Sequence, residues 1–267
     1  MLTNSDEYVK DQYNNAEKLD LRIAVHDLYS KSNGDWHEWV FDQMQVGDRA
    51  NIIEFGCGSG VLWKKNRAKV KPDWTITLTD GSEGMLEQAR QNLGESEQMD
   101  FKVIDIQRTG LEHASFDVAI ANHMLYHVPD LSLAFQEIHR VLKENGTLYA
   151  STNGHAHLQE IFEWVAEFDD NLPFAKPGNS DHFGLETATA KLEPYFGRIQ
   201  LKRFESHLEV TDVLHLAEFI FSIGPQLKDA LLDRGVFPAF ISFLESKRSE
   251  GGYNRITKDS GLLICTK

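Results

Sequence analysis

The chain has 267 residues, of which 27 are lysine or arginine and 41 are aspartate or glutamate, so its formal net charge is −14. This acidic balance disfavours a nucleic-acid substrate, because proteins that bind phosphate backbones normally present a basic face. Hydrophobic residues make up 41% and charged residues 25%, which is ordinary globular usage, and Cys57 and Cys265 are too few for a disulfide framework, which favours the cytoplasm.

The first part of the chain is polar and rich in aromatic side chains. Residues 1–15 lack the apolar segment of a signal peptide, and no apolar stretch of 18 residues occurs anywhere, so we expect neither export nor a membrane span. Residues 6–30, polar with interspersed tyrosines, are predicted to be helical, and the spacing of apolar residues predicts an amphipathic helix over 35–45.

Short apolar runs then alternate with helical patterns. Strands are predicted at 50–55, 74–79, 101–104, 116–121, 147–151, 198–205 and 261–266. Helices are predicted at 82–93, 130–143, 157–169, 185–195 and over most of 211–247, with a loop at 170–183. This order indicates an α/β fold with a doubly wound, mostly parallel, seven-stranded Rossmann-like sheet, a helical N-terminal segment, and a helical cap inserted in the C-terminal part.

A glycine-rich loop follows the first predicted strand. Gly56, Gly58 and Gly60 permit a tight turn, and they allow a ligand to approach main-chain N–H groups at a helix N-terminus. Asp80 ends the next predicted strand, where a carboxylate can accept the hydroxyl groups of a ribose. The pattern predicts a nucleoside-containing ligand at the carboxyl ends of the strands.

The residues around this loop distinguish between two such ligands. The third glycine that dinucleotide binders use is replaced by Val61, and Glu54 precedes the loop. A carboxylate at this place repels a diphosphate but suits an ammonium group. The motif therefore favours S-adenosylmethionine (SAM) over a nicotinamide dinucleotide.

Five motifs in order resemble those of class I SAM-dependent methyltransferases, in particular the small-molecule group that includes the ubiquinone/menaquinone-biosynthesis type. They cover about residues 48–153 and are Ile53–Gly60, Thr79–Leu86, Val103–Ile106, Phe116–Ala119 with Asn122–Val128, and Leu142–Leu148. One departure is the stretch 107–115, which is short for the helix that the family has after Asp105.

The resemblance implies a set of residues around the cofactor. Glu54, Gly56 and Gly58 would hold the methionine end, Asp80 and Gly81 the ribose, Ser82 and Met85 the adenosine, Asp105 and Ile106 the adenine, and Asn122 the region of the ammonium. It also suggests an N-terminal helical segment, residues 1–46, that covers the site of a methyltransferase domain at 47–267, whose cap elements are 155–183 and 206–250. In that segment Tyr13 could stack on the methionine portion, and Arg22 could pair with its carboxylate.

Methyl transfer from a sulfonium is an in-line displacement that needs a base only if the acceptor starts protonated. His127 and His123 flank the end of the fourth strand and are the candidates for such a base, and packing is the alternative role for both. His155 and His157 have no third ligand at a defined spacing, so we expect no metal site. Aromatic residues of the cap line either an acceptor pocket or the cap's own core.

The sequence thus predicts a cytoplasmic SAM-dependent methyltransferase that acts on a small molecule and leaves S-adenosylhomocysteine (SAH). We expect neither a nucleic-acid nor a membrane partner, and the sequence does not decide between a monomer and a homodimer. Two alternatives remain: a non-catalytic SAM-binding protein with a regulatory or assembly role, and a methyltransferase that acts on a macromolecule.

Overall fold

The fold was analysed in a computed structural model that describes residues 16–32, 34–176 and 178–267. These residues form two compact units. One combines the described residues of 1–33, 155–178 and 205–259, and the other combines 34–154, 179–204 and 260–267. We call them the helical unit and the glycine-loop unit.

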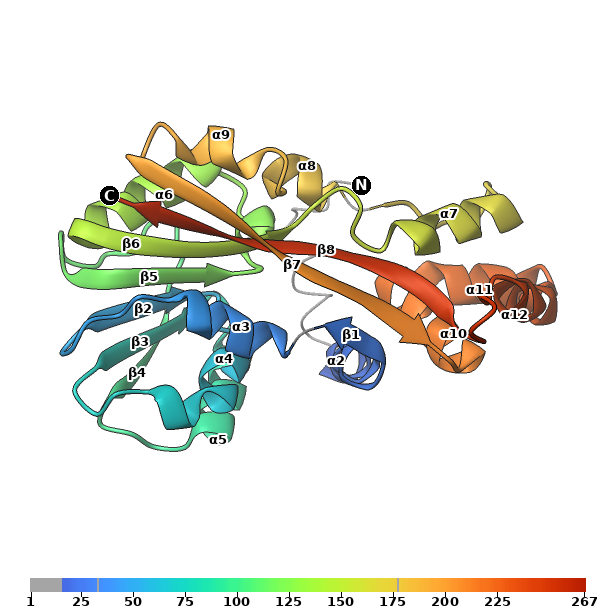
Figure 1. The fold of residues 1–267 in the computed structure, drawn as a ribbon, viewed down its shortest axis with the longest axis horizontal. Coiled ribbons are helices and arrows are strands. Elements are labelled where there is room, and N and C mark those ends of the chain that lie inside the picture. Colours follow the sequence, from blue (N-terminus) through green and yellow to red (C-terminus); the bar gives the residue numbers. More distant parts are fainter. Residues whose placement is uncertain (1–15, 33, 177) are drawn as a thin grey trace. The chain divides into compact units, whose positions relative to one another are not determined.

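The strands, labelled in Figure 1, form an eight-stranded sheet in the order β1-β7-β8-β6-β5-β2-β3-β4. Strands β7 and β8 contribute residues to both units. The five strands β4, β3, β2, β5 and β6, in their order in the sheet, run parallel to one another. Strand β8 is antiparallel to β6, and β1 is antiparallel to β7. The strands are β1 (Ser30–Ser32), β2 (Asn51–Phe55), β3 (Thr75–Asp80), β4 (Met99–Val103), β5 (Phe116–Asn122), β6 (Leu142–Asn153), β7 (Arg198–Val210) and β8 (Asn254–Thr266).

The helices and helical turns occupy the stretches between these strands. They are α2 (Ala16–Tyr29), α3 (Trp36–Gln43), α4 (Val61–Lys65), η1 (Arg67–Lys69), α5 (Glu83–Leu93), η2 (Leu125–His127), α6 (Leu131–Val141), α7 (Gln159–Phe168), α8 (Asn179–Phe183), α9 (Ala188–Leu192), α10 (Val213–Ile223), α11 (Pro225–Asp233) and α12 (Phe237–Ser246).

In the glycine-loop unit, both faces of the sheet are buried, and successive residues of a strand point to opposite faces. Ile53 and Phe55 of β2 belong to a core with α6, α8 and α9, whereas Ile52 belongs to a second core with α3, α4 and α5. Figure 1 shows these two groups of helices on opposite sides of the sheet. Burial on both faces explains why the central strands read as continuous apolar runs.

The helical unit has a core of its own. Val25 of α2 joins buried residues of α7, β7, α10, α11, α12 and β8 in one cluster. The aromatic side chains of the expected cap belong mostly to this cluster: Phe219 and Phe221 are buried in it, and Phe162, Trp164, Phe168 and Phe174 pack against it. These rings therefore form a core, whereas Phe183 packs in the core of the glycine-loop unit.

Three expectations about elements are corrected. The sheet has eight strands instead of seven, because residues 30–32, of which only the first was expected to be helical, form β1 and pair with 206–208 of β7. The expected loop at 170–183 ends in α8, and the helix expected at 185–195 is confined to α9. The polar tripeptide of β1 is too short to show a strand pattern, and its pairing is distant in sequence.

Candidate functional site

The carboxyl ends of β2 and β5 adjoin each other in the glycine-loop unit. β2 lies between β3 and β5, and the chain runs from β2 outward to β3 and β4 before it returns to the other side of β2 as β5. Strand order therefore reverses between β2 and β5, which is where open α/β sheets bind ligands. The glycine loop follows β2 here, and His123 follows β5.

The glycine loop makes a tight turn from β2 into α4. Gly56, Gly58 and Gly60 have φ angles of 64°, 53° and 75°, in the left-handed region that favours glycine. A Cβ atom on Gly56 would lie 2.8 Å from the Cβ of Met124, whereas a Cβ on Gly58 would meet nothing within 4 Å. The loop is therefore closely packed at Gly56 and open at Gly58, where a ligand can approach the main chain.

Asp80 connects the ends of β2 and β3. Its Oδ2 accepts a hydrogen bond from the N–H of Gly58 at 3.0 Å, and its Oδ1 accepts one from the N–H of Ser82 at 2.9 Å. Burial raises the pKa of the carboxyl group, and the main-chain N–H groups of Ser82, Gly58 and Gly81 oppose this rise. The carboxylate is thus held at the edge of the open part of the loop.

Glu54 lies beneath the loop. Its side chain is 2% exposed, and its Oε2 accepts a hydrogen bond from the indole Nε1 of Trp63 at 2.5 Å. Burial and the nearby charge of Asp80 raise the pKa of Glu54 to about 8. The carboxyl is enclosed and largely protonated at neutral pH, so its contact with a cofactor ammonium stays a prediction.

The start of α5 supplies the next predicted residues. Ser82 is the N-cap of this helix, and its Oγ accepts a hydrogen bond from the N–H of Met85 at 3.4 Å. Met85 is 6% exposed, while a Cβ on Gly81 would meet open space within 4 Å. Gly81 and Ser82 thus adjoin Asp80, and the contacts of Gly81, Ser82 and Met85 with a cofactor stay a prediction.

Asp105 and Ile106 follow β4 in a stretch without a helix. No helix occurs in the described stretch 104–115, as the shortness of the predicted element suggested. Asp105 is exposed, whereas Ile106 is 5% exposed and packs in the core with α6. The structure thus gives Asp105 access to a ligand beyond β4, and its bond to an adenine amino group stays a prediction.

The turn after β5 carries Asn122 and His123. Asn122 Oδ1 accepts a hydrogen bond from Ser151 Oγ, and the N–H of His123 donates to the same Oγ at 3.0 Å. His123 has a φ of 53°, and its ring lies 4.9 Å from that of Trp36, centroid to centroid. Ser151 of β6 and Trp36 of α3 therefore set the shape of this turn.

His127 ends the short helix η2. Its ring contacts that of Tyr126 edge to face, with centroids 4.5 Å apart. Burial lowers the pKa of His127 to about 4, so the imidazole is neutral at neutral pH. It is in the protonation state of a base, and its catalytic role stays a prediction.

Two predicted residues belong to the N-terminal part of the chain. Tyr13 lies outside the described residues. Arg22 of α2 belongs to the helical unit, where its guanidinium donates to Ser222, with Nε 3.2 Å from Oγ and Nη2 on the carbonyl oxygen. Its pairing with a cofactor carboxylate stays a prediction.

Sequence reasoning missed the partners that hold the predicted residues in place. Ser151 under Asn122 and Trp36 on His123 come from elements distant in sequence from the motifs that they support, and Trp63 on Glu54 comes from the helix that follows the loop. The only local signal is at Trp63, which stands nine residues after Glu54, at the start of the helix that the loop opens.

The described residues offer neither a metal site nor a membrane-spanning helix. Among residues 16–32, 34–176 and 178–267, no group of three or more His, Cys, Asp or Glu side chains is placed to hold a metal ion. In the same part of the chain, no helix combines the length and apolar character that crossing a bilayer requires.

Comparison with known proteins gives one family match and several relatives. Residues 53–150 match a family described as a methyltransferase domain. A malonyl-[acyl-carrier protein] O-methyltransferase of Legionella pneumophila is 28% identical over 257 aligned residues, which cover 87% of this chain and 86% of that enzyme. The range matched by the family, 53–150, contains the glycine loop, Asp80, Asp105 and the two candidate histidines, His123 and His127.

Solved structures share the fold at lower identity. A candidate methyltransferase of Bacillus halodurans superposes with a TM-score of 0.60 at 16% identity, covering 88% of this chain and 99% of that one. Phosphoethanolamine N-methyltransferase 2 of Haemonchus contortus, solved with SAM, has a TM-score of 0.58 at 17% identity and covers 98% of this chain and 59% of that one. At these identities the likeness extends to the fold alone.

Proposed function

Because residues 53–150 form a class I SAM-dependent methyltransferase domain, we propose that the chain methylates the free carboxylate of a short acyl group carried as a thioester on an acyl carrier protein. A malonyl group is the first candidate acceptor. The proposal is supported by the Legionella relative, whose similarity extends over most of both chains.

The observation that carries the cofactor part of the proposal is the position of Asp80. Its carboxylate bonds to the N–H of Gly58 and lies beside the open space over Gly58 and Gly81. An acceptor for ribose hydroxyls is therefore fixed beside the open part of the glycine loop. This arrangement fits SAM, whose ribose hydroxyls need such an acceptor.

When bound, SAM supplies a methyl group on a positively charged sulfur: an acceptor oxygen bonds to the methyl carbon while the sulfur–carbon bond breaks, leaving SAH and a methyl ester. A carboxylate is already ionised at neutral pH, so this acceptor requires no base. The positive and negative charges neutralise each other, which makes an enclosed, poorly hydrated site favourable for the reaction.

His127 fits such an acceptor as a neutral group. His127 is buried with a pKa of about 4, so it adds no positive charge beside a sulfonium. We propose that His127 and His123 shape the acceptor side of the site, with His127 the candidate base if the acceptor is instead an alcohol or a phenol. Replacement of His127 by phenylalanine distinguishes the two: carboxylate methylation keeps most of its kcat if no base is used.

Cofactor binding is tested by thermal unfolding with SAH and with NAD as the matched control. At a concentration 100 times its Kd, SAH should stabilise the protein by about 2.7 kcal/mol and raise the Tm, whereas NAD should not. Asp80→Ala should remove the shift, while Asp100→Ala, an exposed aspartate on β4, should keep it. A Tm that responds to NAD and not to SAH would refute the cofactor.

The acceptor is tested with SAM labelled in its methyl group. Malonyl-acyl carrier protein should take up label that alkali releases as methanol, and acetyl-acyl carrier protein, which has no free carboxylate, should not. Label on neither protein, with a normal SAH shift, would refute this acceptor and leave the cofactor assignment standing.

A further inference from the structure

The stretch 104–115 has to hold Asp105 in place without a helix. It connects β4 to β5, and within it Asp105 is exposed while Ile106 and Thr109 are buried. A loop of this kind gains little from regular main-chain hydrogen bonds, so its conformation depends on side-chain contacts with a neighbouring element. In this structure that element is α6.

Gln107 provides the first attachment. Its main-chain N–H and its Nε2 both donate to Asp105 Oδ1, at 2.9 and 3.1 Å. Its Oε1 accepts a hydrogen bond from the N–H of Asp130 at 3.1 Å, and Asp130 is the N-cap of α6. One glutamine amide therefore connects the Asp105 carboxylate to the start of a core helix.

These bonds leave the second carboxylate oxygen of Asp105 for another partner. Both contacts of Gln107 are made with Oδ1, and within the described residues no hydrogen bond to Oδ2 is found. Two donors on one oxygen limit rotation of the carboxylate, and therefore fix the direction in which Oδ2 faces.

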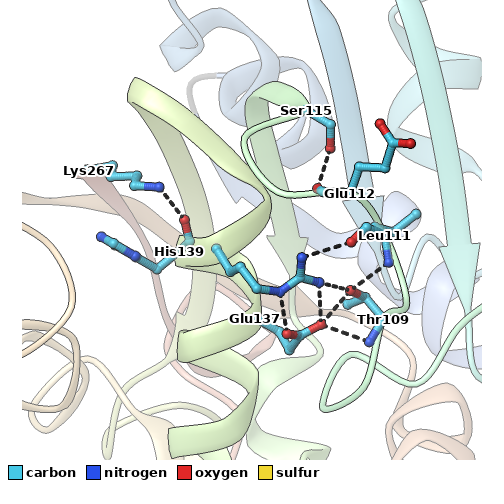
Figure 2. Close-up of polar contacts among 8 residues, drawn as sticks. Thr109, Leu111, Glu112, Ser115, Glu137, His139 and Lys267 are labelled. Carbon is cyan, nitrogen blue, oxygen red and sulfur yellow. Dashed lines mark hydrogen bonds and ion pairs between the residues drawn. The ribbon is translucent and has the colours of Figure 1, made fainter.

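The last turn of α6 provides the second attachment (Figure 2). The Arg140 guanidinium pairs with Glu137 in a fork, with Nε 2.7 Å from Oε1 and Nη2 2.9 Å from Oε2. Glu137 Oε2 also accepts from the N–H and Oγ1 of Thr109 at 3.0 and 2.5 Å, and Arg140 Nη1 donates to the Leu111 carbonyl at 2.8 Å. The far part of the loop is thus bound to α6 as well.

We propose that Gln107 is a positioning residue for adenine recognition: it orients the Asp105 carboxylate so that Oδ2 accepts a hydrogen from the adenine amino group, and the Glu137–Arg140 pair secures the loop that carries both. The proposal rests on SAM being the cofactor. If the proposal holds, the protein distinguishes adenine from a purine with an oxo group in place of the amino group only while Gln107 orients Asp105. Gln107 itself does not touch the cofactor.

The test compares SAH with S-inosylhomocysteine, which has an oxygen in place of the adenine amino group, by isothermal titration calorimetry. The wild-type protein should prefer SAH by roughly tenfold or more, because a hydrogen bond to a charged group is lost with the analogue. Gln107→Leu should weaken SAH binding by roughly five- to tenfold and reduce the preference towards unity, with a small change in the Tm of the ligand-free protein.

Two further variants make the result specific. Gln107→Glu keeps an acceptor for the Asp130 N–H but replaces the donor to Asp105 by a negative charge, so it should lose the preference as Gln107→Leu does. Gln136→Leu on α6, whose amide bonds to Ser132 Oγ, is the matched control and should bind both ligands like the wild type.

An unchanged preference in Gln107→Leu and Gln107→Glu would overturn the proposal. Failure of the wild-type protein to bind SAH at all would instead overturn the cofactor assignment on which it rests, so the two failures are distinguishable.

Discussion

Two glycines of the same loop differ in what a side chain would meet. Gly56 and Gly58 both have positive φ angles, but a Cβ atom would clash with Met124 only at Gly56. The main-chain conformation is needed at both positions, and close packing only at one. Comparing the two positions therefore separates the need for a left-handed main chain from the need for space beside Met124.

Gly56→Ala should therefore destabilise the protein more than Gly58→Ala. At both positions the left-handed conformation costs roughly 1–2 kcal/mol, and overpacking against Met124 should add about 1–3 kcal/mol at Gly56. Urea denaturation of the two ligand-free variants measures the difference. Equal losses would mean that Met124 moves aside without cost.

The buried carboxyl of Glu54 should make stability depend on pH. Its pKa is about 8 in the folded protein and ordinary, near 4.5, in the unfolded chain. The folded state thus retains a proton that the unfolded state releases, so the stabilisation is full below pH 4.5 and is lost as the pH rises through 8.

Replacement of Glu54 by glutamine should flatten this dependence. The slope of unfolding free energy between about pH 5 and 8 should fall by up to roughly 1.4 kcal/mol per pH unit, the value for one proton. Urea denaturation across this range measures it, and Asp80, whose pKa is also raised, accounts for a remaining slope. An identical slope in the variant would show that Glu54 is ionised in the folded protein.

At the scale of elements, α6 both fills the core and holds an irregular loop. Its inner face contributes Phe135 and Ile138 to the core, and its last turn carries the Glu137–Arg140 pair. Arg140 and Thr109 hold the pKa of Glu137 at about 2. The stabilisation from this carboxylate is therefore present above pH 4.5 and is lost as the pH falls through about 2.

Arg140→Met should release the loop. We expect a loss of about 1 kcal/mol at neutral pH, a shallower decline of stability between pH 4.5 and 2, and faster hydrogen exchange at the Thr109 amide, which donates to Glu137. Arg90→Met is the control, because the Arg90–Glu83 pair is exposed and should contribute little. Unchanged exchange at Thr109 would show that the arginine is dispensable there.

The sequence predicted elements and motifs whose signals are local. The strand pattern around β2, the spacing from the glycine loop to Asp80 and the shortness of the stretch after Asp105 all follow from adjacent residues. β1 could not be predicted, because its three polar residues become a strand only by pairing with β7. The contacts of Trp63 with Glu54 and of Gln107 with Asp130 depend on side-chain packing in three dimensions, which no spacing rule contains.

At the scale of the whole molecule, neither unit is a continuous piece of chain. Three segments form each unit, and β8 contributes residues to both. Within the glycine-loop unit, Leu263 of β8 is fully buried in the core beside α6. The last strand is therefore part of the structure that supports the cofactor site.

Leu263→Ala should cost about 2–5 kcal/mol, the range for a buried leucine, and should lower the Tm accordingly. Leu214→Ala, a leucine that is 57% exposed on α10, is the matched control and should change stability by no more than about 0.5 kcal/mol. Thermal and urea unfolding measure the stability of both variants. A loss for Leu263→Ala as small as that for Leu214→Ala would mean that β8 is not part of the cooperatively folded core.

The pairing of β6 with β8 also sets an order of events during protein synthesis. Asn153 and Ser260 are partners in this pair and are 107 residues apart in the chain. At about 5–20 residues per second, a ribosome needs roughly 5–20 s to deliver the second strand after the first. For that time one edge of β6 has no partner strand, and an unpaired edge of this kind is a template for aggregation. Newly made chains should therefore benefit most from chaperones in this interval.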